Sequence, residues 1–386
     1  MPTLGRSTRS IWIPPMQKIR HTLVAQTLGT PREVISLHFG PQGQGRKAYL
    51  QAGLHADEHP GMLVLHHLKQ RLMELEAAGR LTGEVVLVPI ANPIGLGNYV
   101  FGRQLGRFEL SSRENFNRHY LELAKLVSEQ VANELGEDID VNVELIRECM
   151  RTSLQAMQPR TELESLRLIL QRLACDADCV LDVHCDSEAM LHIYVHSEQQ
   201  AEARVLAGLT RAYATLHALE QGGNSFDESF TAVWYSLRQA FPQHPIPMAT
   251  FAATVELRGL NDVSHELAKT DAEALLAYLC HQGLIADMPP DVPLPLYEPT
   301  PLTAVEVLNA PHAGVVAYRA PIGEWVESGT ALADIIDPLT DRVSTLTSNI
   351  AGVFYARVQE RFTEANAELT FVAGQVPIRD GYLLSA

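Results

Sequence analysis

Residues 47–90 read KAYLQAGLHADEHPGMLVLHHLKQRLMELEAAGRLTGEVVLVPI, and this stretch decides the expected fold. Its two ends, 47–54 and 84–90, are apolar runs of the kind that form strands. Residues 62–80 between them have apolar side chains at helical spacing and a glycine near the end. A strand, a helix and a second strand in this order indicate a crossover unit in a mostly parallel sheet.

The rest of the chain up to residue 287 extends this pattern. Further strands are expected at 33–39, 179–185, 190–196 and 248–257, and helices at 198–216, 229–240 and 263–281. The segment from about 120 to 175 is expected to be helical throughout, and we interpret it as an insertion. We therefore predict an α/β domain over residues 1–287, with a mostly parallel mixed sheet and helices on both faces.

The C-terminal part differs in character. Residues 288–301, MPPDVPLPLYEPTP, carry six prolines and are interpreted as a linker. Beyond it, 313–335 and 351–372 form a weak internal repeat of short strands and turns. Residues 302–386 are therefore expected to form a small all-β domain, which resembles the barrel-sandwich fold of lipoyl and biotinyl carriers. A carrier needs a lysine on its hairpin, and the last lysine of this chain is Lys269, so the carrier role is excluded.

Composition limits the class of protein. The 386-residue chain has a formal net charge of −16 and no basic block, which argues against a nucleic-acid or anionic-membrane partner. No run reaches the roughly 18 apolar residues that a membrane-spanning helix needs, and residues 1–20 lack the apolar core of a secretory signal. The five cysteines are odd in number and show no disulfide or zinc-ribbon spacing. We therefore expect a cytoplasmic protein.

Residues 55–59, HADEH, place two imidazoles and two carboxylates directly after a predicted buried strand. Three interpretations are open. His55 and Glu58 could be zinc ligands with a third ligand far downstream, or His55 and His59 could bind the metal with Glu58 as the base. In the third interpretation the stretch is a polar turn before the next helix. Because Pro60 disfavours helical backbone at His59, we favour the first interpretation.

A third ligand is expected at the end of another buried strand, because zinc in hydrolases usually keeps three protein ligands and one open position. His184 ends an apolar run, as His55 does. Sites in open α/β sheets gather at the carboxyl ends of the strands, so these two residues can meet. Asp182 points to the same face as His184 and is expected to orient a ligand. The alternative is that His184 only caps a strand.

A zinc hydrolase also needs a carboxylate that does not bind the metal. This group takes a proton from water and returns it to the leaving nitrogen. Glu256 lies near the end of the apolar run 248–257, where a carboxylate costs free energy unless it is hydrogen-bonded, solvated or functional. Beside the histidines and Glu58, we interpret Glu256 as the general base rather than an ordinary charge at a strand end.

Together these residues resemble the succinylglutamate desuccinylase/aspartoacylase family, relatives of the zinc carboxypeptidases. The matching features are Gly-x-His-x-x-Glu at 53–58, Asn92-Pro93, Asn117-Arg118, the strand ending in His184, and TVEL with Glu256. They follow the family's order over roughly residues 48–260, and the C-terminal β domain resembles the one attached in this family. The family commonly has an aspartate where this chain has Asn115, and the Phe-Pro-Gly often found after the arginine is replaced by HYLEL.

The resemblance implies a zinc carboxypeptidase-like fold and hydrolysis of an N-acyl amino acid or a related small N-acyl amine. One zinc ion per chain would be held by His55, Glu58 and His184. Glu256 would take the proton of the water that attacks the amide carbonyl.

The resemblance also assigns residues to the substrate. The Asn-Arg pair, Asn117 and Arg118, would bind a carboxylate, a task that suits the bidentate geometry of arginine. An arginine that polarises the carbonyl is expected before this pair, with Arg107 as the first choice and Arg103 as the second. Two other functions stay open, a carboxypeptidase on short peptides and a non-catalytic metal-binding protein. The sequence also leaves open whether the chain forms a homo-oligomer.

Overall fold

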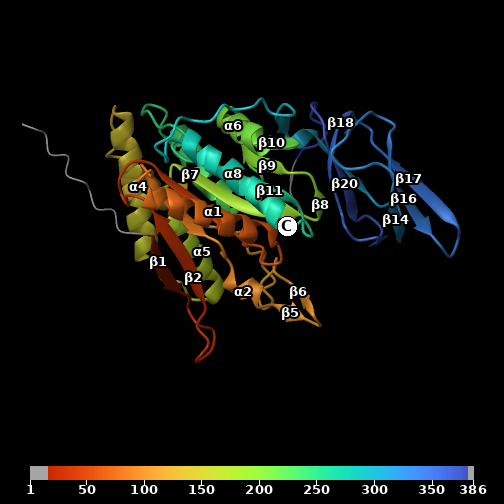
Figure 1. Ribbon diagram of the computed structural model, residues 1–386, viewed down its shortest axis with the longest axis horizontal. Coiled ribbons are helices and arrows are strands. Elements are labelled where there is room, and N and C mark those ends of the chain that lie inside the picture. The colour runs from red at the N-terminus through yellow and green to blue at the C-terminus, as the bar shows by residue number, and fades with distance from the viewer. Residues whose placement is uncertain (1–15, 381–386) are drawn as a thin grey trace, which may run out of the picture.

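Within residues 16–380, which the computed structural model describes, nine strands form one mixed sheet (Figure 1). Residues 1–15 and 381–386 lie outside the described residues. The prediction that residues 1–20 contain no secretory signal therefore falls mostly on residues that are not described. The strand order is β1-β2-β4-β3-β7-β11-β9-β10-β12. The strands are β1 (Gln17–Thr22), β2 (Glu33–Phe39), β3 (Lys47–Ala52), β4 (Glu84–Val88), β7 (Cys179–Asp186), β9 (His192–His196), β10 (Ala214–Ala218), β11 (Phe251–Gly259) and β12 (Thr300–Pro301).

The sheet is mostly parallel, as predicted. Strands β4, β3, β7 and β11 are neighbours that run parallel, and β9, β10 and β12 form a second parallel group. The two groups meet at the antiparallel pair of β11 and β9, and β2 and β1 add an antiparallel edge. The central strands therefore end at a common edge, where an α/β protein places its site.

Helices cover both faces of the sheet, which confirms the expected layers (Figure 1). One face carries α1 (Pro60–Ala77), α6 (Gln200–Thr210) and α8 (His265–His281), and the other carries α3 (Leu123–Val131), α4 (Ile139–Ala156), α5 (Glu162–Ala174) and α7 (Phe226–Ala240). Alternate residues of a strand serve the two cores, so Leu50 of β3 packs under α1 and α8 while Tyr49 packs toward α7. The segment 120–175 contains α3, α4 and α5, as its predicted helical character requires, and its interpretation as an insertion stays a prediction.

One predicted helix is partly wrong. The pattern predicts a helix over 198–216, but α6 ends at Thr210 because Arg211 adopts a left-handed backbone with φ of 58°. Residues 214–218 then form β10, an interior strand between β9 and β12. The sequence ATLHA of this stretch has only one β-branched residue, Thr215, and neither glycine nor proline separates it from the end of the helix.

The C-terminal part forms two small sheets, ordered β13-β20-β18-β15 and β17-β16-β14-β19. Their strands are β13 (Val305–Asn309), β14 (Gly314–Tyr318), β15 (Trp325–Val326), β16 (Ala331–Asp337), β17 (Arg342–Thr347), β18 (Gly352–Arg357), β19 (Phe362–Thr363) and β20 (Glu368–Ala373). The internal repeat is visible in the pairing. Each half has two paired long strands, and its short strand pairs with the other half, β15 with β18 and β19 with β14. An independently folding barrel-sandwich domain stays a prediction.

The two parts of the chain are joined by more than the proline-rich segment. Strand β8 (Glu188–Ala189) pairs with β18, and the last residues of the segment 288–301 enter the large sheet as β12. The remaining short elements are α2 (Pro93–Leu96), β5 (Tyr99–Val100) and β6 (Arg103–Gln104), with 3₁₀ turns at Ser197–Gln199 and Leu302–Ala304. In the part of the chain that the structure describes, no helix combines the length and apolarity needed to cross a membrane.

Candidate active site

The predicted site residues lie where β3, β7 and β11 end at the same edge of the large sheet. His55 and Glu58 lie in the turn between β3 and α1. His184 of β7 and Glu256 of β11 are direct partners in the parallel register. The fold therefore brings the turn with His55 and Glu58 together with His184 and Glu256, which are far from it and from each other in the sequence.

The turn that carries His55 and Glu58 has its own supports. Gly53 opens it with a left-handed backbone, φ of 69°, which a residue with a side chain rarely adopts. Asn92, which follows β4, donates from its Nδ2 to the carbonyl oxygen of Leu54 over 2.8 Å. The segment Asn92-Pro93 thus holds the metal-candidate turn from the neighbouring strand.

Glu58 bridges the two histidines. Its Oε1 lies 2.9 Å from Nδ1 of His55, and its Oε2 lies 2.8 Å from Nδ1 of His184. All three side chains are buried, and one potential ligand atom from each lies within 4.8 Å of the others. Two imidazole nitrogens and one carboxylate oxygen are a donor set that zinc uses in hydrolases. The residues present therefore fit a divalent metal ion.

His59 is not part of this group. The expectation that Pro60 keeps His59 out of the helical region is wrong, because His59 has φ of −83° and ψ of −26°. However, α1 begins only at Pro60, and Nε2 of His59 contacts Oε1 of Gln104 at 2.9 Å. His55 and His59 therefore do not lie one turn apart on a continuous helix.

Charge balances the buried group. Burial alone would raise the pKa of Glu58, but the two histidines hold it well below its ordinary value. Burial alone would lower the pKa of His184, but Asp182 and Glu58 raise it well above its ordinary value. Burial lowers the pKa of His55. A divalent cation would take over the positive charge that a proton on His184 supplies.

Each histidine has an oxygen beside its far nitrogen. Nε2 of His55 lies 2.9 Å from Oδ1 of Asn115, and Nε2 of His184 lies 3.0 Å from Oδ2 of Asp182. The second contact is at ion-pair distance, but its angle departs from that of a good hydrogen bond. Such acceptors favour a proton on Nε2 and leave Nδ1 to face a metal. Asn115 therefore presents an oxygen to His55, as an aspartate would.

Behind His184 the polar contacts continue into the core. Asp182 is fully buried, and its Oδ1 accepts a hydrogen bond from Nε2 of Gln51 over 2.9 Å. Oε1 of Gln51 in turn accepts from the hydroxyl of Tyr49 over 2.8 Å. This chain of partners fixes which oxygen of Asp182 faces His184.

Glu256 lies beside the metal-candidate group without belonging to it. It lines the same cavity as His55 and His184, and its buried Oε2 has no hydrogen-bond partner among residues 16–380. Burial raises the pKa of Glu256 well above its ordinary value, and the charge of Glu58 adds to this effect. Such a carboxyl group is suited to hold and release a proton.

Two of the three predicted arginines line the cavity. Nη1 of Arg107 lies 3.3 Å from Nδ1 of His55 and 3.7 Å from Oε1 of Glu58. Arg118 lines the cavity next to Asn117 and donates from Nη1 to the carbonyl oxygen of Asn117 over 2.8 Å. Arg103 is exposed on β6 and does not line the cavity.

Residues 44–282 match the family model of the succinylglutamate desuccinylase/aspartoacylase catalytic domain, which is more than half of the chain. The chain belongs to the succinylglutamate desuccinylase/aspartoacylase family. Family proteins from Shewanella amazonensis and Shewanella frigidimarina are similar in structure. The first is 25% identical, with a TM-score of 0.80 over 93% of this chain and 98% of its own. The second is 23% identical, with a TM-score of 0.81 over 93% and 96%.

The product-bound ectoine utilization protein EutE of Ruegeria pomeroyi shares the fold. It is 17% identical, with a TM-score of 0.66 over 95% of this chain and 98% of its own. The comparison with curated proteins finds no match. Desuccinylases and aspartoacylases are hydrolases that act on small acyl amino acids, so the family is one of deacylase-like hydrolases.

In this member of the succinylglutamate desuccinylase/aspartoacylase family, the candidate site opens into a cavity of about 170 Å³. One wall belongs to the C-terminal part of the chain and consists of Leu302, Val305, Val307, Tyr355, Glu368, Phe371 and Arg379. Tyr194 and Asp227 line it from the large domain. Sequence reasoning missed these residues because no motif surrounds them.

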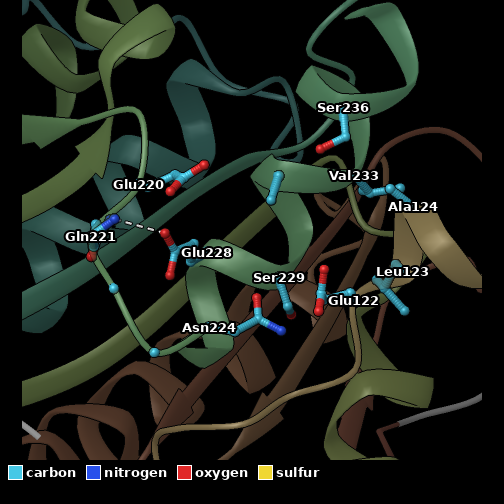
Figure 2. Close-up of a pocket in the computed structure, with 13 residues that line it drawn as sticks. Glu122, Leu123, Ala124, Glu220, Gln221, Asn224, Glu228, Ser229, Val233 and Ser236 are labelled. Carbon is cyan, nitrogen blue, oxygen red and sulfur yellow. Dashed lines mark hydrogen bonds between the residues drawn. The ribbon is translucent and has the colours of Figure 1, made fainter. Parts of the chain in front are cut away.

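A larger pocket of about 570 Å³ lies between the start of α3 and the start of α7 (Figure 2). Its lining contains none of the metal-candidate residues, whereas the smaller cavity is lined by His55 and His184. Gln221 lines both, and the loop 221–224 therefore separates them.

Proposed function

We propose that this family member is a zinc-dependent deacylase that hydrolyses the amide bond of a small N-acyl amino acid or a related N-acyl amine. The observation that carries the proposal is the buried group of His55, Glu58 and His184 with Glu256 beside it in one cavity. This set has the donors for one zinc ion and, separately, a carboxyl group for proton transfer.

His55, Glu58 and His184 would hold the zinc ion through Nδ1, a carboxylate oxygen and Nδ1. When bound, zinc supplies Lewis acidity, which lowers the pKa of a water molecule and polarises a carbonyl. Glu256 takes the proton of the attacking water and later returns it to the leaving nitrogen. The absence of a hydrogen-bond partner for Oε2 of Glu256 supports this role, because the oxygen is available to a water or a substrate.

The arginines are assigned to the substrate. Arg107 would stabilise negative charge that develops on the acyl oxygen, and the 3.3 Å between its Nη1 and Nδ1 of His55 supports this role. Arg118 would bind the carboxylate of the amino acid. Asn117 supports that position, since its Oδ1 accepts from the backbone nitrogen of Phe226 over 2.8 Å and its carbonyl accepts from Arg118.

The shape of the cavity favours a small substrate over a peptide. Its volume is about 170 Å³, and residues of β13, β18 and β20 wall one side. A peptide chain needs an open groove beyond the scissile bond, whereas an N-acyl amino acid does not. We therefore place the deacylase ahead of the carboxypeptidase. The cytoplasmic location stays a prediction.

The test is an assay of the purified, zinc-loaded protein against a panel of N-acyl amino acids and short peptides. The proposal expects release of a carboxylic acid and a free amine from at least one N-acyl amino acid. The variant Glu256→Gln is the matched control, because it keeps the shape of the side chain and removes its proton transfer. Turnover of peptides alone, or equal turnover by Glu256→Gln, would contradict the proposal.

A further inference from the structure

The loop 221–224 lies between the cavity of the candidate site and the larger pocket of Figure 2. Three successive residues in it have a left-handed or related backbone, with φ of 110° at Gly222, 78° at Gly223 and 51° at Asn224. This backbone turns the chain sharply before α7 begins at Phe226.

The same loop runs along the segment that carries Asn117 and Arg118. The carbonyl oxygen of Gly223 accepts from the backbone nitrogen of His119 over 2.9 Å, and that of Asn224 accepts from the nitrogen of Tyr120 over 3.1 Å. The side chain of Asn224 returns a hydrogen bond to the carbonyl of Tyr120. Hydrogen bonds therefore join the loop to the segment that carries Arg118.

Gly223 is in direct contact with the side chain of Arg118. A Cβ on Gly223 would collide with Cδ of Arg118 and lie 2.9 Å from its Nε. The colliding atoms belong to a flexible side chain and not to backbone, so the fold can accommodate the change by moving Arg118. The side chain of Arg118 thus occupies space that a Cβ on Gly223 would need.

The other side of the loop is held by a buried acid. Oε1 of Glu228, a residue that is only 7% exposed, accepts from the backbone nitrogen of Gln221 over 2.7 Å (Figure 2). On the side that faces the larger pocket, the loop is held by Glu228 of the first turn of α7.

We propose that Gly223 is a positioning residue for Arg118 and that Glu228 holds the loop that presents it. This inference rests on the proposed function, because it assumes that Arg118 binds the carboxylate of the substrate. Gly223 itself contacts neither the substrate nor the reacting atoms. It acts by allowing the guanidinium of Arg118 to reach the cavity.

The test is the variant Gly223→Ala of the full-length, zinc-loaded protein, compared with Gly283→Ala. Gly283 has nearly the same φ, 75° against 78°, but among the described residues other than its chain neighbours no atom lies within 4 Å of a Cβ there. The control therefore carries the backbone strain without the collision. We expect Gly223→Ala to raise KM roughly 10- to 100-fold with little change in kcat and full zinc occupancy, and Gly283→Ala to leave both unchanged.

A double-mutant cycle separates positioning from general damage. In an Arg118→Ala background, Gly223→Ala should have no further effect on KM, because the side chain it displaces is gone. If Gly223→Ala folds poorly, Glu228→Ala is tested in its place in the wild-type and Arg118→Ala backgrounds. Glu228→Ala should then raise KM only in the protein that retains Arg118. A KM equal to that of Gly283→Ala, or an unchanged effect in the Arg118→Ala background, would overturn the inference.

A crystal structure of Gly223→Ala keeps this inference distinct from the proposed function. The guanidinium of Arg118 should be displaced relative to the wild-type protein, and an undisturbed Arg118 would overturn the inference even if the enzyme is active. If the wild-type protein hydrolyses no N-acyl amino acid, the proposed function fails. The position of Arg118 in the variant still decides whether Gly223 places it.

Discussion

Asp182 offers the sharpest test of how the candidate metal site is organised. Its Oδ2 lies 3.0 Å from Nε2 of His184, and its Oδ1 accepts from Nε2 of Gln51. Asp182→Asn keeps the size of the side chain but exchanges one acceptor for an NH₂ donor. Because Gln51 presents a donor to Oδ1, the new NH₂ group is forced toward His184.

A donor facing Nε2 reverses the tautomer of His184. Nε2 must then accept, and the remaining proton moves to Nδ1, the atom that faces Glu58 and the metal position. Loss of such a supporting partner costs roughly 10- to 100-fold in metal affinity. Each factor of ten corresponds to about 1.4 kcal/mol. Asp182→Asn replaces the acceptor that faces His184 by a donor and also removes the negative charge. We therefore expect zinc affinity to fall by roughly 100-fold.

The assay is a zinc competition titration against a chelator of known affinity. Tyr49→Phe is the matched control, because it removes the far end of the same chain of contacts and leaves the pair of Gln51 and Asp182 in place. We expect Tyr49→Phe to change zinc affinity little. A zinc affinity of Asp182→Asn equal to that of the wild-type protein would refute the assignment of Asp182 as the residue that orients His184.

Three further predictions concern the same site. Glu256→Gln should lower kcat by a factor of roughly 10² to 10⁴ and still bind zinc. The zinc content of the variant is measured beside its activity, and loss of zinc would contradict the prediction. Removing the metal with a chelator should lower the melting temperature measured by calorimetry, because the ion binds only the folded chain, and an unchanged transition would speak against a site in the fold. Zinc affinity should weaken as the pH falls, starting above the ordinary range of histidine, because Asp182 and Glu58 raise the pKa of His184 and a proton competes for Nδ1. Titrations at several pH values test this, and constant affinity between pH 8 and 6 would contradict it.

The central sheet was predictable because its strands are buried on both faces. Such strands are continuous apolar runs, and the runs at 33–39, 179–185 and 248–257 all became strands. The edge strand β1 was missed because its residues are mostly exposed and have no apolar pattern. Strand β10 was assigned to a helix because the left-handed Arg211 carries no sequence signal for a helix end.

The residues of the candidate site also fall into two groups, those that the sequence predicts and those that it does not. His55, His184 and Glu256 each end an apolar run, and the ends of parallel strands converge, so their proximity could be predicted from the sequence. Arg379 and Gly223 reach the site region through contacts between distant segments. No local pattern records such contacts, because only tertiary packing brings the segments together.

The most direct test of the central claim is an anomalous-scattering map at the zinc edge from crystals grown with zinc. We expect one strong peak per chain, within coordination distance of Nδ1 of His55, a carboxylate oxygen of Glu58 and Nδ1 of His184, with Glu256 beside it and unliganded. A peak coordinated by other residues, or zinc-loaded crystals without density between these three side chains, would contradict the account.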